Sequence, residues 1–126
     1  MANGVTVLNA GFTWQDPTLN TNGTTTASGG LSGYNIGVRA VGSSTVTANP
    51  PGTYPNNCAV SGATATSLTT AAFLAAVSPQ LVAGTYFAAV QAVGVSPNEG
   101  IGAWSSEVEF VIPAPTPNPP ANFTVA

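Results

Sequence analysis

Two neighbouring segments with alternating apolar residues constrain the fold of this chain more than any other feature of its sequence. They span residues 84–94 and 104–112. Because successive side chains of a β-strand point to opposite faces, alternate residues from Tyr86 to Ala92 share one face, as do those from Val108 to Ile112. Each segment can therefore bury one face in a common core. We predict that the two segments are neighbouring strands of a β-sandwich.

Turn residues divide the rest of the chain into short segments rich in β-branched and aromatic side chains, the pattern of an all-β sandwich. We expect further strands at residues 5–8, 11–15, 33–41, 44–48 and 63–70. The stretches 17–30 and 49–57 contain many glycine, proline and asparagine residues, which predicts loops. Residues 70–77 are rich in alanine and leucine, which favours one or two helical turns capped by Thr70 and ended by Pro79.

With 126 residues, the chain is long enough for one core and too short for two. We predict a single domain at residues 1–112, a proline-rich linker at 113–120 and a strand-like C-terminal tail at 121–126. A polyproline-type linker of this length spans about 25 Å at ~3.1 Å per residue. The single cysteine, Cys58, cannot form an intrachain disulfide, and we interpret it as a small, partly buried residue in a loop.

Charged residues make up only 4% of the chain, against roughly 25% in a typical soluble protein. The single basic residue, Arg39, argues against nucleic-acid binding, which needs clustered cations. Without lysine or histidine, most general-base, nucleophilic and metal-binding arrangements are also missing, so we predict no enzymatic activity, cofactor or metal. A surface of hydroxyl and amide groups provides little repulsion between copies and suits a protein that packs against neighbours.

The acidic residues give two weak indications of a binding site. Asp16 with Asn20 and Asn22 suggests a calcium loop, but a single carboxylate favours ordinary Asx turns instead. Glu107 and Glu109 lie two residues apart on a predicted strand, which indicates an exposed strand edge and not a facing acid/base pair. Neither group predicts catalysis.

An interface is the more informative hypothesis for the apolar residues. Phe87, Ala89 and Val93 lie on the face opposite Tyr86, where they would form an apolar stripe open to a partner. The alternative is that the alanine-rich turn at 71–77 covers this stripe. In the proline-rich loop, Tyr54 is the candidate for an exposed aromatic contact.

No run of 18 apolar residues exists, which predicts no membrane span. The first residues, Met1-Ala-Asn-Gly, have neither a basic nor an apolar region typical of a secretory signal. We expect either that the protein stays in the cytoplasm until assembly or lysis, or that a signal has been removed.

Four segments, in order, resemble a fibronectin type III domain of the bacterial or phage kind: Phe12–Gly23, Leu31–Val38, Leu81–Tyr86 and Trp104–Val108. The resemblance implies an immunoglobulin-like antiparallel β-sandwich in which Tyr86 forms a tyrosine corner. The stretch 49–77 is longer than this family usually needs.

Residues 119–125 resemble the opening of such a domain, yet they stand at the C-terminus of this chain. The tail therefore begins a following repeat, folds back on its own domain, or adds a strand to a neighbouring copy. We favour the third alternative, with Phe123 and Val125 as contacts.

These observations predict a non-enzymatic structural protein. We expect an accessory or decoration protein on a phage virion surface or similar assembly, which binds other copies of itself, a capsid protein or a tail protein. The alternative is a spacer or carbohydrate-associated module excised from a secreted bacterial enzyme or adhesin.

Overall fold

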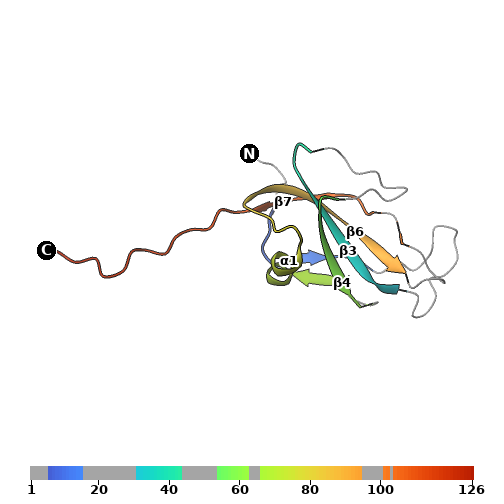
Figure 1. Cartoon of the computed structure of the whole chain (residues 1–126), viewed down its shortest axis with the longest axis horizontal. Helices are drawn as coiled ribbons and strands as arrows, with labels where there is room; N and C mark the ends of the chain where they lie inside the picture. Colours follow the sequence, from blue (N-terminus) through green and yellow to red (C-terminus); the bar gives the residue numbers. More distant parts are fainter. Residues whose placement is uncertain (1–5, 16–30, 44–53, 63–65, 95–100, 103) are drawn as a thin grey trace.

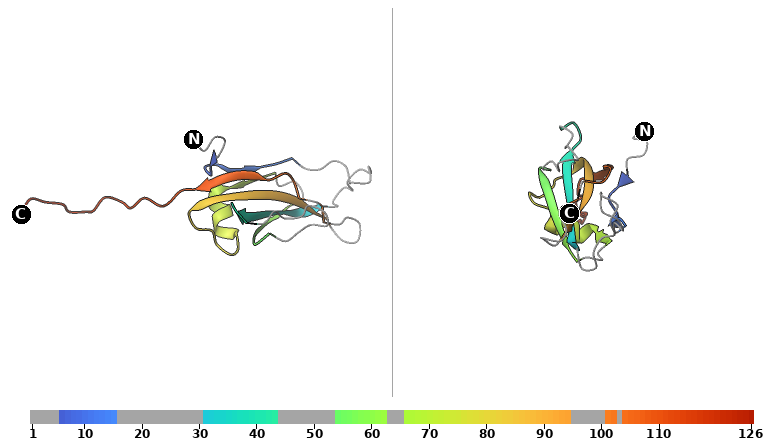
Figure 2. Two further views of the ribbon diagram at one scale, coloured as in Figure 1. Left: turned by 90° about the horizontal axis from the view of Figure 1, so that it is seen from above. Right: turned by 90° about the vertical axis from the view of Figure 1, so that its right-hand side faces the viewer.

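The computed structural model describes residues 6–15, 31–43, 54–62, 66–94, 101–102 and 104–126. These residues form two β-sheets, one short helix and an extended C-terminal segment (Figure 1). The larger sheet has five strands in the order β1-β7-β6-β3-β4, and the smaller sheet pairs β2 with β5. Viewed end-on, the larger sheet forms one layer, and the smaller sheet with the helix forms the other (Figure 2). The predicted strand at 44–48 and the loop at 17–30 lie outside the described residues.

The centre of the larger sheet is the antiparallel pair β3 (Leu31–Ala40) and β6 (Gly84–Gly94), with Ile36 opposite Val90. On one side, β7 (Val108–Ile112) pairs with β6 and places Phe110 opposite Tyr86. On the other side, β4 (Asn56–Ser61) pairs with β3. The predicted pairing of the two alternating segments is confirmed, although the second strand begins at Val108 and not at Trp104.

The outermost strand of this sheet, β1 (Thr6–Val7), runs parallel to β7, with Thr6 opposite Phe110. The sheet is therefore mixed, and the expectation of a purely antiparallel fold is wrong at this edge. Side-chain alternation indicates which face a strand buries but not the direction of its neighbour, so the sequence did not predict how β1 would pair. After β1, the N–H of Leu8 also donates to the carbonyl of Val111 on β7, at 2.9 Å, and the chain then continues into the smaller sheet.

The smaller sheet consists of β2 (Gly11–Thr13) and β5 (Ser67–Thr69), which are antiparallel. The helix α1 (Thr70–Ala76) follows β5 directly. Its N-cap is Thr69, whose hydroxyl accepts the backbone N–H of Ala72 at 3.2 Å. The prediction of a short helical turn is confirmed, but the cap lies one residue earlier than Thr70.

The core lies between the two layers and is rich in aromatic side chains. Phe73 of α1 is fully buried, and its ring meets Phe12 edge-on at 5.0 Å between centroids. Phe12 also meets Phe110 of β7 at 5.3 Å. These contacts join the helix, the smaller sheet and the larger sheet into one core, which also contains Ile36, Val38, Cys58, Val77, Tyr86 and Ala88.

The strand β4 was not predicted, because residues 49–57 were expected to form a loop. The prolines of that stretch stand at 50, 51 and 55, all before the strand begins, so they delimit β4 without interrupting it. Cys58 therefore lies in a strand, opposite Ile36, and is only 1% exposed. The expectation of a partly buried loop cysteine is wrong.

The last fourteen residues, 113–126, extend away from the domain (Figures 1 and 2). All are exposed, and they pair with no strand in the part of the chain that the structure describes. Phe123 and Val125 are 95% and 98% exposed. In this structure the tail does not fold back on its own domain. No helix among the described residues is long and apolar enough to span a membrane.

Candidate functional site

The face of the larger sheet that points away from the core is covered by side chains of the same chain. Arg39 on β3 donates two hydrogen bonds, both 2.7 Å, to the two carboxylate oxygens of Glu107. The Tyr54 hydroxyl donates a third to Glu107, at 2.8 Å. We call these three residues the Arg39 cluster. Two parallel N–H···O bonds from a guanidinium fix the orientation of a carboxylate, so the cluster holds residues 54 and 107 over the sheet.

The ring of Tyr54 is 2% exposed and lies across Gly37. A Cβ atom at Gly37 would come within 2.4 Å of the ring carbon Cδ2, so only glycine permits this packing. Trp104 meets Tyr54 edge-on at 4.7 Å. Tyr54 is therefore a buried part of the domain, and its prediction as an exposed contact is wrong.

The predicted apolar stripe is also covered. Phe87 is half-buried, with the Arg39 guanidinium 4.5 Å from the centre of its ring. Ala89 is 4% exposed, and Val93 is half-buried beside Ile101. The cover is not the helix, as the alternative held, since α1 packs into the core between the sheets. It comes from the Arg39 cluster and the segment before β7.

The electrostatics of the Arg39 cluster stabilise the ionised pair. The hydrogen bonds from Arg39 lower the pKa of Glu107 below its ordinary value, and the bond from Tyr54 adds to this effect. Burial, with the hydrogen bond to Glu107, raises the pKa of Tyr54 to about 12. At neutral pH, Glu107 is therefore a paired carboxylate and Tyr54 a neutral hydrogen-bond donor. Glu107 lies before β7, which begins at Val108. The prediction that Glu107 lies on an exposed strand edge is therefore wrong.

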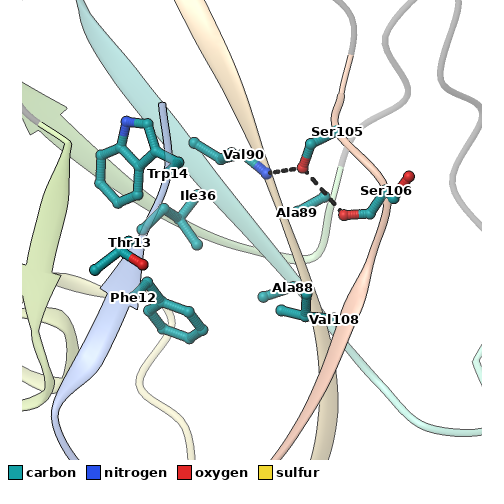
Figure 3. A pocket seen from close by; sticks show the side chains of 10 residues that line it. All are labelled: Phe12, Thr13, Trp14, Ile36, Ala88, Ala89, Val90, Ser105, Ser106 and Val108. Atoms are coloured by element: carbon teal, nitrogen blue, oxygen red, sulfur yellow. Dashed lines mark hydrogen bonds between the residues drawn. The ribbon is translucent and has the colours of Figure 1, made fainter. Parts of the chain in front are cut away.

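An opening in the described part of the domain lies between the two layers, where β2 faces the start of β7 (Figure 3). We call this opening, of about 240 Å³, the seam pocket. Phe12 of β2 and Trp14, the residue after β2, form one wall, and Val108 lies on the other. None of its lining residues is charged, and the remaining ones are Thr13, Ile36, Ala88, Ala89, Val90, Ser105 and Ser106.

The rim of the seam pocket near β7 is fixed by Ser105. Its hydroxyl accepts the backbone N–H of Val90 at 3.0 Å, and its own backbone N–H donates to the carbonyl of Val90 at 2.8 Å. A serine side chain thus replaces one bond of the β6–β7 ladder. The pocket offers apolar surface and hydroxyl groups, but no pair of groups suited to acid/base or nucleophilic catalysis. The walls of the pocket come from four elements that are distant in the sequence. The one local signal is the two-residue spacing of Phe12 and Trp14, which places both side chains on the same face.

Beside the seam pocket, the outer edge of β2 has no partner strand among the residues that the structure describes. The Trp14 N–H donates to the carbonyl of Thr66 at 2.9 Å, toward β5. Because the backbone groups of successive strand residues point to opposite sides, the N–H and C=O of Thr13 point away from β5. Within the described ranges no strand lies on that side of β2.

The described residues contain no group of three or more His, Cys, Asp and Glu residues arranged to hold a metal ion. Asp16, Asn20 and Asn22, the weak calcium candidates, lie outside the described residues. Comparison of the chain with protein families, with curated proteins and with solved structures found no match in any of the three.

Proposed function

We propose that this protein is a non-enzymatic structural protein that assembles through its C-terminal tail. Its proposed place is the surface of a phage virion or a similar repeating particle, as an accessory or decoration protein bound to copies of itself, a capsid protein or a tail protein. The observation that carries the proposal is the tail itself, an unpaired segment that exposes Phe123 and Val125 almost completely. An exposed apolar segment beyond a folded domain is typical of binding by strand addition.

The proposed domain is a fibronectin type III-like member of the immunoglobulin-like sandwiches. Two facing sheets, with the first and last strands adjacent, support this assignment. So does Tyr86 at the start of β6, whose hydroxyl donates to the carbonyl of Val82, four residues earlier, at 2.7 Å. This geometry is that of a tyrosine corner. The proposed virion setting rests on analogy with other proteins of this fold class, and a fold alone does not determine function.

Because the outer face of the larger sheet is covered, fewer of the predicted interface residues are available to a partner. The residues 87, 89 and 93 were expected to contribute to an interface, but the Arg39 cluster and its neighbours already occupy that face. The proposed contacts are therefore the tail residues Phe123 and Val125, which keep their predicted role.

The test is the molar mass of the full chain by light scattering over a wide range of concentrations. We expect association that is lost when the chain ends after Ile112. The truncation removes no core residue, so the domain should still fold. As a full-length control, Phe123→Ser with Val125→Ser should weaken association equally, whereas Thr116→Ser in the linker should not. A full-length chain that stays monomeric at millimolar concentration would favour the alternative, a spacer or carbohydrate-associated module.

A further inference from the structure

We propose that the outer edge of β2, beside the seam pocket, receives the tail of a second copy. Residues 123–125 would pair with β2 as an added strand, and the side chains of Phe123 and Val125 would enter the seam pocket. This inference rests on the proposed function and names the surface that receives the tail.

The edge of β2 has the geometry that strand addition requires. Thr13 directs its N–H and C=O away from β5, and the described residues provide no partner on that side. Exposed strand edges of this kind pair readily with another chain. On the larger sheet, β1 covers β7 only at Phe110 and Val111. The space between β2 and the start of β7 is therefore left open, and a strand beside β2 would cover it.

The apolar side chains of the tail match the apolar, uncharged lining of the seam pocket. Phe123 and Val125 lie two residues apart, so in a strand both point to the same face. Neither the tail nor the pocket lining contains a charged residue. The volume of about 240 Å³ is below the roughly 300–1,000 Å³ of typical small-molecule sites. It suits a few apolar side chains better than a cofactor.

A second copy is the favoured donor because of the linker. Prolines at 113, 115, 117, 119 and 120 fix much of its backbone in an extended conformation. The tail therefore leaves the end of β7 and points away from its own domain (Figures 1 and 2). To reach its own β2, the chain would have to reverse direction within this stiff segment.

The edge of β4 is a weaker candidate, because Asn57 of this strand already exchanges two backbone hydrogen bonds with Ser78. Its inward-facing residue Cys58 is already 1% exposed, and the seam pocket does not extend to it. A strand added to the rest of this edge would also leave Phe123 without an apolar pocket. The seam pocket therefore favours β2 over β4 as the edge that receives the tail.

Amide hydrogen exchange of the full chain tests the receiving edge directly. At a concentration where the chain is associated, we expect the amide of Thr13 to exchange at least about tenfold more slowly than in the Phe123→Ser, Val125→Ser variant. A matched pair of variants tests the pocket. Val108→Asp places a charge at its mouth and should raise the dissociation constant about tenfold or more. Val82→Asp, at another exposed valine that lies outside the pocket, should change the dissociation constant less than about twofold.

The possible outcomes separate this inference from the proposed function. Tail-dependent association with protection on β4 at residues 56–61, and none at Thr13, would overturn the inference and leave the proposed function intact. Protection of Thr13 in a monomer would mean that the tail binds its own domain, which overturns the second-copy donor. A monomer without protection of Thr13 would overturn both.

Discussion

Replacing Gly37 with alanine tests whether Tyr54 closes the outer face of the larger sheet. The new methyl group would lie 2.4 Å from Cδ2 and 2.5 Å from Cγ of the Tyr54 ring, well inside van der Waals contact. The ring must therefore move, and its movement would also disturb the hydrogen bond to Glu107 and the contact with Trp104. We expect the substitution to destabilise the domain, although it adds only one methyl group to a strand.

The magnitude follows from how far the ring moves. Overpacking that is relieved by a local shift costs about 1–3 kcal/mol. Complete expulsion would expose an aromatic side chain that buries roughly 150–250 Å², which at ~25 cal/mol per Å² is about 4–6 kcal/mol. Because Tyr54 lies at the surface of the sheet, a shift is the easier response. We therefore expect a loss of about 1–3 kcal/mol for Gly37→Ala.

Urea unfolding of a double-mutant cycle measures this effect. Tyr54→Ala alone should cost about 3–5 kcal/mol. In that background the methyl group meets no ring, and Gly37→Ala should become neutral or stabilise the domain by about 0.4–1 kcal/mol, because alanine restricts the unfolded chain. Gly102→Ala is the control, since its Cβ would lie at an ordinary 3.5 Å from the nearest atom. If the costs of Gly37→Ala and Tyr54→Ala are additive, the proposed contact does not exist.

Three further predictions concern the pH dependence, the core and the thiol. Because the pKa of Glu107 is lowered in the folded protein, its ionised carboxylate stabilises the fold. This stabilisation is fully present above the ordinary pKa of 4.5 and is lost as the pH falls through the lowered value. Thermal melts of Glu107→Gln should lack this loss of stability in acid. The pKa of Tyr54 is raised from 10.0 to about 12, so stability should fall as the pH rises between these values, and Tyr54→Phe should reduce this loss, to which the buried Cys58 thiol, with its raised pKa, also contributes. Phe73→Ala should lower the free energy of unfolding by about 3–5 kcal/mol, measured in urea, and a cost below about 1 kcal/mol would contradict its place in the core. Burial raises the pKa of the Cys58 thiol, so labelling by a disulfide reagent should proceed only as fast as the chain unfolds; rapid labelling of the native protein would refute its burial.

The parts of the fold that sequence predicts well are those with local periodicity. The strand β6 alternates over eleven residues, and β3 places Tyr34, Ile36 and Val38 on one face as expected. The helix α1 could be predicted because its segment contains alanine and leucine in place of the β-branched residues that are typical of strands. In each case the signal lies within one segment, so no knowledge of distant contacts is needed.

The features that the sequence did not reveal depend on contacts between distant residues. Arg39 and Glu107 are 68 residues apart in the chain, and no local pattern pairs them, although a lone arginine on a sheet face requires a carboxylate partner when it is buried. The strand β4 has only two inward-facing apolar residues, Cys58 and Val60, and its start is obscured by Pro55. The tail was separable from the domain because its prolines interrupt the strand pattern after Ile112.

The Arg39 cluster also determines how salt should affect the assembly of this protein. Arg39 is the only basic side chain of a chain with net charge −3, and it is already neutralised by Glu107 within its own domain. No basic side chain is therefore left to attract the acidic groups of a neighbouring copy. Added salt should screen the weak repulsion between copies within a Debye length of about 8–10 Å. Association should accordingly be unchanged or slightly strengthened as ionic strength rises, the opposite of an assembly held by ion pairs.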